Sequence, residues 1–145
     1  MKISTKGRYA LRLMADLARA PQDSLTPIKD IAERQDISEK YLEQIVRSLV
    51  RAKLVVSTRG AQGGYALADA PDKITVGMVL RATEGTLEPV GCVSSDCFCD
   101  KHDNCDTIYV WRQITEAING VVDSITLADL ISRKPECAER FKIEL

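Results

Sequence analysis

Residues 36–50 read Asp36-Ile37-Ser38-Glu39-Lys40-Tyr41-Leu42-Glu43-Gln44-Ile45-Val46-Arg47-Ser48-Leu49-Val50, and they carry the clearest structural signal in the chain. Asp36-Ile37-Ser38 predicts a tight turn. Ser38 is a suitable N-cap because its hydroxyl can accept a hydrogen bond from the first turn of a helix. In that helix, apolar side chains recur three or four positions apart and predict one buried face. The face comprises Tyr41, Leu42, Ile45, Val46, Leu49 and Val50.

A shorter helix is predicted immediately before this turn. Thr26-Pro27 predicts its start, with Thr26 as the N-cap and Pro27 as the first helical residue. The helix ends near Arg34-Gln35, and its apolar side chains are expected to face the core: Ile28, Ile31 and Ala32. Two short helices joined by a tight turn, the second with polar residues at its start, are typical of a helix-turn-helix.

The next segment predicts a β-hairpin wing. Residues 54–58 and 65–67 have the pattern of two short strands, and the glycine-rich sequence Arg59-Gly60-Ala61-Gln62-Gly63-Gly64 joins them. Glycines allow a backbone to approach a phosphate chain, and Arg59 suits a narrow minor groove, where the negative potential is deepest. A nucleotide-binding loop is the rival interpretation, but the segment lacks the Lys-Ser/Thr pair of a P-loop and does not open a helix. The predicted fold is mainly α with a small β-wing, a winged helix-turn-helix.

Helices are also predicted on both sides of this unit. One runs from about Lys6 to Ala20 with Ser4 or Thr5 as its cap, and Thr75 caps another short one. A long helix is predicted over 106–124 and a last short one over 126–131. The long helix carries an apolar stripe that is expected to form a dimer seam, although part of it can close the chain's own core. The stripe comprises Ile108, Trp111, Ile114, Ile118, Val121, Val122 and Ile125.

Composition and charge limit the class of protein. Hydrophobic residues make up 45% and charged residues 28% of the 145 residues, as in ordinary globular domains. No apolar run approaches the roughly 20 residues of a membrane helix. The N-terminus lacks the apolar core of a signal peptide, so the expected location is the cytoplasm, with no membrane partner. Residues 1–67 carry 12 Lys/Arg and 7 Asp/Glu, whereas the remainder carries 8 and 14. The basic half is a weak indication of an anionic partner.

Four of the five cysteines lie within residues 92–105, with the spacing C-x4-C-x-C-x5-C and the chain's one histidine, His102, in the last interval. Cytoplasmic thiols stay reduced, so clustered cysteines favour a metal site or a redox role over structural disulfides. Zinc is a poor match because its sites commonly use paired CxxC steps. A redox dithiol lacks that spacing too, although Cys97-Phe98-Cys99 could form a strained bridge. Wide, flexible spacing best suits the larger body of an iron–sulfur cluster.

Several motifs together resemble a known family. They are Lys6-Gly7-Arg8-Tyr9-Ala10, Tyr41-Leu42-Glu43-Gln44, Arg59-Gly60 with Gly63-Gly64-Tyr65, Trp111 six residues after Cys105, and Ile125-Thr126-Leu127. Over about residues 1–132 the chain resembles the IscR-type iron–sulfur cluster regulators, in the winged-helix repressor superfamily that includes NsrR and CymR. The resemblance implies a homodimer with one 2Fe–2S cluster per subunit, supplied by the cluster-assembly machinery. It also implies binding to a double-stranded DNA operator, repression of cluster-assembly genes, and a cluster-free form that binds a second class of DNA sites.

The resemblance also implies specific DNA contacts. Arg59 and Gly60 of the wing are expected at the minor groove, and Lys6, Arg8 and Arg47 at phosphates. The implied major-groove residues lie at the start of the third predicted helix: Ser38, Lys40, Tyr41, Glu43 and Gln44. The chemistry agrees, because Gln pairs well with adenine and Glu can accept a hydrogen bond from cytosine. For Tyr41, packing in the core is an equally good interpretation.

The cluster site departs from the family pattern, which has three cysteines with five residues between neighbours and a histidine three positions after the third. Cys99 and Cys105 keep that interval, Cys92 is one residue too far from Cys99, and Ile108 occupies the histidine position. The expected ligands are therefore Cys92, Cys99 and Cys105. Cys97 is the first candidate for the fourth ligand and His102 the alternative. A 4Fe–4S cluster or zinc is less well supported than a 2Fe–2S cluster.

The expected organisation has four parts: a winged helix-turn-helix DNA-binding domain over 1–83, a cluster-binding loop over 84–105, a dimerisation helix with a short following helix over 106–132, and a tail over 133–145. The expected function is a cluster-sensing, DNA-binding transcriptional repressor. The alternatives are a nitric-oxide or thiol redox-sensing repressor of the same superfamily and a zinc-stabilised interaction module. No enzyme is expected, because the sequence shows neither a nucleophile–base pair nor a nucleotide-binding motif.

Overall fold

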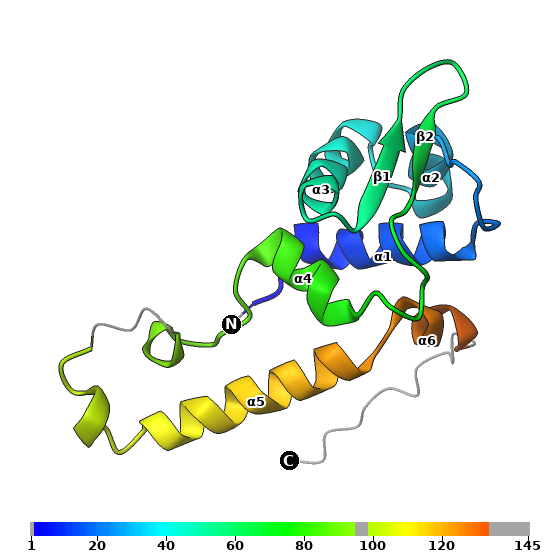
Figure 1. Ribbon diagram of the computed structural model, residues 1–145. Coiled ribbons are helices and arrows are strands. Elements are labelled where there is room, and N and C mark those ends of the chain that lie inside the picture. Colours follow the sequence, from blue (N-terminus) through cyan, green and yellow to red (C-terminus); the bar gives the residue numbers. More distant parts are fainter. Residues whose placement is uncertain (1, 95–98, 134–145) are drawn as a thin grey trace, which may run out of the picture.

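The computed structural model describes residues 2–94 and 99–133, and they form a mainly helical fold with a small β-hairpin (Figure 1). The long helices and the hairpin confirm the predicted fold class. In chain order the elements are α1 (Thr5–Arg19), α2 (Ile28–Gln35), α3 (Glu39–Arg51), β1 (Val55–Thr58), β2 (Gly64–Leu67), α4 (Val76–Glu84), the short 3-10 helices η1 (Gly91–Val93) and η2 (His102–Asn104), α5 (Ile108–Ser124) and α6 (Leu127–Ser132).

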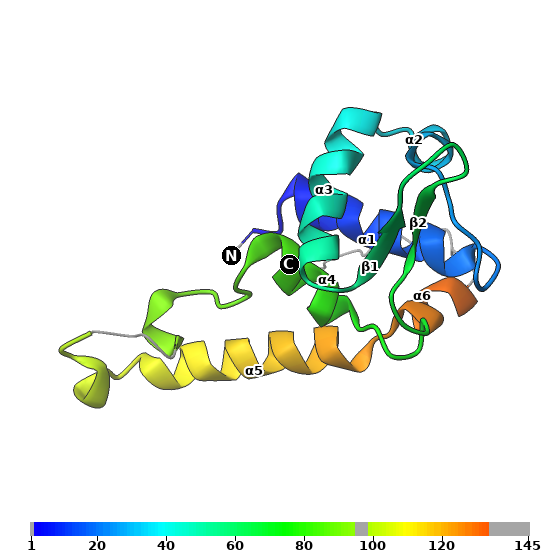
Figure 2. The same cartoon turned by 45° about the horizontal axis from the view of Figure 1, so that its top comes forward.

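Helix α1 lies at the centre of the fold. It contacts α2 and α3 on one side and α4 and α6 on the other (Figures 1 and 2). Of the two predicted caps, Ser4 is the N-cap, and its hydroxyl accepts a hydrogen bond from the Gly7 N–H at 3.2 Å. The side chains of Leu13 and Met14 are fully buried. They belong to one apolar cluster with residues of α2, α3, β1 and α6, including Ile31, Leu42, Ile45, Leu49, Val55 and Leu127.

The turn between α2 and α3 forms as the sequence predicts. The Ser38 hydroxyl accepts a hydrogen bond from the Tyr41 N–H at 3.3 Å, which confirms Ser38 as the N-cap of α3. Asp36 adopts a left-handed conformation, with φ 53°, and so ends α2 abruptly. The predicted stripe of α3 faces the core, with Tyr41 and Val50 at its half-buried edges. Helices α2 and α3 therefore form a helix-turn-helix.

The predicted cap of α2 is wrong. Pro27, and not Thr26, is the N-cap residue, and it makes no side-chain capping bond. Thr26 is instead buried, and its backbone N–H and C=O pair with those of Tyr65 at 2.9 Å each. A Cβ at Gly64 would lie 2.7 Å from the Thr26 carbonyl oxygen, so glycine permits this approach. The backbone of Thr26 thus extends the hairpin, in which β1 and β2 pair antiparallel from Val55 opposite Leu67 to Thr58 opposite Gly64.

Helix α5 extends away from α1–α4 and α6, and its N-terminal end lies far from them in both views (Figures 1 and 2), while η1 contacts α5. Helix α6 returns to the centre, where Leu127 is fully buried. We call the unit of α1–α4, β1, β2 and α6 the winged-helix core. Residues 85–94 and 99–125, which include η1, η2 and α5, are called the arm. Among the helices of the described chain, none combines the length and the apolar character that a membrane crossing requires.

Candidate DNA-binding surface and cysteine loop

The exposed face of α3 presents the polar residues that the sequence singled out. Leu42, Ile45 and Leu49 anchor the opposite face of the helix in the core, and this anchoring fixes which side chains point to solvent. The exposed set comprises Ser38, Lys40, Glu43, Gln44 and Arg47. These side chains carry the donors and acceptors that read base edges and phosphates, so the face is chemically suited to a DNA groove.

Tyr41 differs from its neighbours on α3. Its ring is half-buried and meets the ring of Tyr9 edge-on, with 5.9 Å between the ring centroids. The guanidinium of Arg12 lies over the ring of Tyr9, 5.3 Å from the ring centroid. Tyr41 therefore packs against α1, as one of its two sequence interpretations expected, and a DNA contact by its hydroxyl stays a prediction.

The tip of the hairpin exposes Arg59 and Gly60. Gly60 adopts φ 121°, which favours glycine, and its carbonyl accepts a hydrogen bond from the Gly63 N–H at 3.0 Å. A Cβ at Gly63 would lie 2.2 Å from the Thr58 carbonyl oxygen. The glycines therefore make a narrow turn at the tip of the hairpin, where Arg59 is exposed.

The two basic residues at the start of α1 have different surroundings. The Lys6 ammonium donates to the Ser48 hydroxyl of α3 at 2.9 Å, so its side chain joins the two helices. Arg8 is exposed and donates to the Thr5 hydroxyl at 3.3 Å. Arg8 is the more available of the two for a phosphate, and the assignment of both to DNA stays a prediction.

A buried carboxylate in α1 is a structural feature that the sequence reasoning missed. Asp16 is 9% exposed and accepts hydrogen bonds from Arg34 at 2.7 and 3.1 Å and from Gln35 at 3.0 Å. Burial alone raises the pKa of Asp16, but these hydrogen bonds and the charge of Arg34 outweigh it and hold the pKa below the usual 3.8. The network fixes α2 against α1. Its sequence signal was an acid next to the apolar stripe, between Met14 and Leu17.

The cysteine loop is described in part. Cys92 lies in η1, Cys99 precedes η2, and Cys105 precedes α5, and these three are free thiols that are half-buried or exposed. Cys97, the first candidate for the fourth ligand, lies outside the described residues, as does the fifth cysteine, Cys137. Within 2–94 and 99–133, no three Cys, His, Asp or Glu side chains are close enough together to hold a metal ion. The structure therefore presents the separate donors without bringing them together.

Polar contacts occupy two of the candidate ligands. The Cys105 sulfur lies 3.3 Å from the Thr107 hydroxyl, and the side-chain and backbone hydrogen bonds of Thr107 hold the pKa of Cys105 below its usual value. The two ring nitrogens of His102 face Asp103 Oδ1 at 3.2 Å and Arg112 Nη2 at 3.5 Å. A lowered thiol pKa favours the thiolate, the form that binds metals. His102 would have to turn away from Arg112 or Asp103 to bind one.

The apolar residues of α5 fall on two faces. Ile118, Val122 and Ile125 pack on a small cluster of the core that includes Val76 and Leu80. A second face points to solvent, about a quarter turn away around the helix. It comprises Val110, Ile114, Ala117 and Val121, and Tyr109 is exposed beside it. Of the predicted stripe, Ile118, Val122 and Ile125 therefore close the chain's own core, whereas Ile114 and Val121 lie on the exposed face. Val110 and Ala117 share that face but were not part of the predicted stripe.

Known proteins resemble the chain over most of its length. The family model described as Rrf2, iron-dependent transcriptional regulator, matches residues 3–133. The solved structure of CymR, the global cysteine regulator of B. subtilis, matches with a TM-score of 0.75 and 44% identity over 91% of this chain and 97% of that one. The solved structure of T. potens IscR matches with a TM-score of 0.70 and 42% identity over 91% and 87%. IscR of Aliivibrio salmonicida is 40% identical over 131 residues, which are 90% of this chain and 77% of that protein.

Proposed function

The chain belongs to the Rrf2 family of iron-dependent transcriptional regulators, and on that premise we propose that it is a homodimeric repressor whose cysteine loop holds an iron–sulfur cluster. Like its relatives named IscR and CymR, it is a DNA-binding transcriptional regulator and not an enzyme. The observation that carries the finer proposal is the presence of three free thiols in one loop, Cys92, Cys99 and Cys105, which adjoins both α4 and α5.

In this proposal α3 enters the major groove and the wing tip reaches the minor groove. The support is the polar face of α3, with Glu43, Gln44 and Arg47 exposed, and the exposed Arg59 at the wing tip. The affinity for a duplex that the protein itself selects should fall steeply as the salt concentration rises, because phosphates that the protein neutralises release their counterions. Arg59→Ala should weaken binding about tenfold, consistent with roughly 1–3 kcal/mol for a groove arginine. Lys73→Ala, at an exposed ion pair with Asp69 on the loop before α4, is the matched control and should leave binding unchanged.

The proposed dimer uses the outward face of α5. Val110, Ile114, Ala117 and Val121 follow each other at intervals of four, three and four residues, the spacing of a coiled-coil seam. Val110 is 48% exposed and Val121 59% exposed in the single chain. Pairing two copies along this seam would cover both and set two α3 helices on one duplex, about 34 Å apart.

Cys92, Cys99 and Cys105 are the proposed cluster ligands, with Cys97 or His102 as the fourth. The donor chemistry suits the group, since thiolates are the usual ligands of iron–sulfur clusters. A bound cluster would supply a centre that responds to iron supply and oxidation. The chain's own part is to offer thiolates, and the hydrogen bonds of Thr107, which lower the pKa of Cys105, favour that form.

The proposal is tested on protein purified without oxygen. Visible absorption with iron and sulfide analysis should find about two irons and two sulfides per chain, the composition of a 2Fe–2S cluster. Replacing any of Cys92, Cys99 or Cys105 by Ala should abolish the absorption, while Cys137→Ala is the matched control and should retain it. Cys97→Ala and His102→Ala are then compared, and the variant that loses the visible absorption identifies the fourth ligand. If any one of the variants at Cys92, Cys99 and Cys105 retains full absorption, the assignment is wrong.

A thiol-responsive regulator is the second candidate function. It is favoured by the similarity to CymR, which is described as a global cysteine regulator, and by the free, partly exposed state of the described cysteines. In that case the protein would be colourless and metal-free, and its DNA affinity would change between reduced and oxidised protein. A colourless protein with one tightly held zinc would instead support a structural metal site.

A further inference from the structure

The C-terminal end of α5 is firmly attached to the winged-helix core. The Val76 N–H donates to the Ile125 carbonyl at 2.9 Å, and the Leu127 N–H donates to the Ile74 carbonyl at 2.9 Å. Ile118 and Val122 add apolar contacts to Val76 and Leu80 of α4. The other end of α5 extends beyond the core (Figures 1 and 2). Helix α5 is therefore attached to the core near its C-terminal end, while η1 of the arm contacts it as well. Contacts near the C-terminal end thus contribute to its direction relative to the core.

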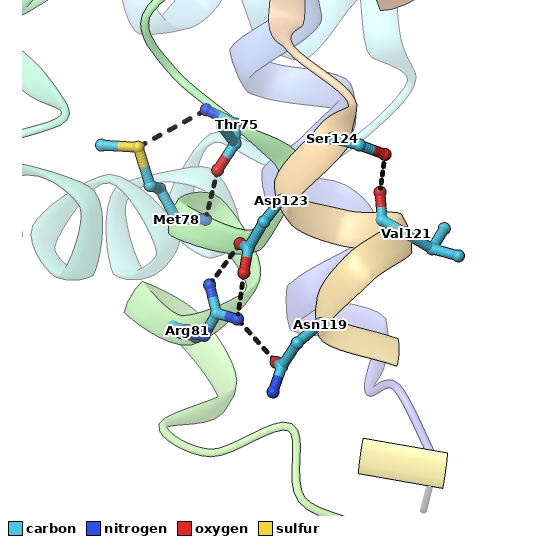
Figure 3. Close-up of polar contacts among 7 residues, drawn as sticks. All are labelled: Thr75, Met78, Arg81, Asn119, Val121, Asp123 and Ser124. Atoms are coloured by element: carbon cyan, nitrogen blue, oxygen red, sulfur yellow. Dashed lines mark hydrogen bonds and ion pairs between the residues drawn. The ribbon is translucent and has the colours of Figure 1, made fainter. Parts of the chain in front are cut away.

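Arg81 of α4 makes the polar contact that connects these two helices. Its Nη1 donates to Asp123 Oδ1 at 2.6 Å, and its Nη2 donates to Asp123 Oδ2 at 2.9 Å and to Asn119 Oδ1 at 2.7 Å (Figure 3). Asn119 and Asp123 are one helical turn apart on α5. The donors of a planar guanidinium have a rigid geometry. When Arg81 binds both Asn119 and Asp123, it therefore fixes the direction of α5 as well as its distance from α4.

A glycine allows this contact. Gly77 is buried on α4, and a Cβ there would lie 2.0 Å from Asp123 Oδ1 and 2.6 Å from Arg81 Nη1. Any larger residue would occupy the position of the carboxylate. The present position of the Asp123 carboxylate beside Arg81 therefore depends on the absence of a side chain at residue 77.

Helix α4 is itself tied to the DNA-binding part of the core. The Ser4 N–H and hydroxyl donate to Glu84 Oε1 at 3.2 and 2.6 Å, which joins the end of α4 to the start of α1. Lys6, two residues further, donates to Ser48 of α3. A contact that orients α5 relative to α4 thus orients it relative to α1 and α3 as well.

We propose that Arg81 is a positioning residue that fixes the direction of α5 relative to the winged-helix core and thereby sets the DNA half-site spacing that the dimer accepts. This inference rests on the proposed dimer through α5. The distance along α5 from its attached end at Ile125 to Val110, the far residue of the seam, is about 22 Å, so a tilt of about 10° displaces that residue by about 4 Å. One base pair rises about 3.4 Å along a duplex, so a small change in direction matches a change of one base pair in spacing.

Arg81 acts on direction more than on stability. Its side chain and that of Asp123 are 37% and 46% exposed, and ion pairs with that exposure contribute little to folding. The apolar contacts of Ile118 and Val122 hold the helices together but are not directional. Without the guanidinium, the helices should remain packed while their relative angle becomes less defined.

The test compares duplexes that differ in half-site spacing. Wild-type protein selects its preferred duplex from a random pool, and one base pair is then inserted or removed between the half-sites. Wild type should lose at least tenfold in affinity on the altered duplexes. Arg81→Met and Asp123→Asn should lose less than threefold between the same duplexes, and the double variant should behave like either single one. Lys73→Met is the matched control, because the Lys73–Asp69 pair connects neither helix to the other, and it should keep the tenfold preference.

Two further measurements separate positioning from a general loss of structure. The affinity for a duplex with one half-site and the dimer mass from sedimentation should match the wild type in each variant. If Arg81→Met keeps the wild-type spacing preference, or if it weakens every duplex equally, including the single half-site, the positioning role is wrong. If the wild-type protein is monomeric or selects no duplex, the proposed dimeric repressor fails, and the role of Arg81 fails with it.

Discussion

The winged-helix core and the arm are built from similar proportions of apolar residues but use them differently. In the core, Leu13, Leu42 and Leu49 are fully buried, and the buried side-chain nitrogen and oxygen atoms of the described residues all have hydrogen-bond partners. In the arm, none of the 17 described residues of α5 is buried, although the helix is strongly apolar. The core therefore accounts for its own stability, whereas the arm has an apolar face and free thiols that a second chain and a metal centre would complete.

The largest expected effect is in the core. Leu42→Ala should lower the free energy of unfolding by about 2–5 kcal/mol, because it leaves a cavity where the side chain has no exposure. Urea unfolding followed by circular dichroism measures the loss. Val56→Ala, at a strand residue that is 47% exposed, is the control and should change stability by less than about 0.5 kcal/mol. Equal losses in the two variants would contradict the description of the core as self-sufficient.

In the arm, the expected effect of a substitution is on dimerisation. Val121→Lys places a charge in the proposed seam and should weaken dimerisation about 100-fold, roughly 2.7 kcal/mol, while the monomer keeps its helical content. Sedimentation across a dilution series measures the dissociation constant. Glu116→Lys introduces the same side chain on a different, exposed side of α5 and should leave the dimer intact. A Val121→Lys protein that dimerises like the wild type would exclude this face as the seam.

The buried carboxylate of Asp16 is a feature of the core that the arm lacks among its described residues. Asp16→Asn should lower stability by about 1–3 kcal/mol at neutral pH, because Arg34 loses the charge of its partner. Since the pKa of Asp16 is lowered in the folded protein, its contribution is present above the usual 3.8 and is lost as the pH falls through the lower folded value. The difference in unfolding free energy between wild type and variant should therefore be constant near neutrality and shrink below about pH 3.8. A difference that persists unchanged in acid would assign the effect to packing.

The same contrast explains what could be predicted from the sequence. Local signals were sufficient where an element's partners are its neighbours in the chain: Ser38 as a cap, the stripe of α3, and the glycine-rich turn at Gly60. They failed for Thr26, whose backbone pairs with Tyr65, and for Asp16, whose partners lie 18 and 19 residues away. On α5, the helical periodicity identified apolar residues but not which of them face the core and which face solvent. Tertiary packing decides this, since it places Ile118 and Val122 against α4. The cysteine spacing predicted the chemistry of the thiols, but spacing alone does not give their arrangement in space.

The smallest expected effect compares the starts of α3 and α5. In the core, the Ser38 hydroxyl accepts the Tyr41 N–H, so Ser38→Ala should cost about 1 kcal/mol. In the arm, Thr107 holds the corresponding position before α5, but its hydroxyl pairs with the Cys105 sulfur and makes no capping bond. Thr107→Ala should therefore change stability by less than about 0.5 kcal/mol. Urea unfolding of both variants measures the difference. If Thr107→Ala costs as much as Ser38→Ala, the start of α5 is capped like that of α3, and the arm is more self-sufficient than its exposed residues indicate.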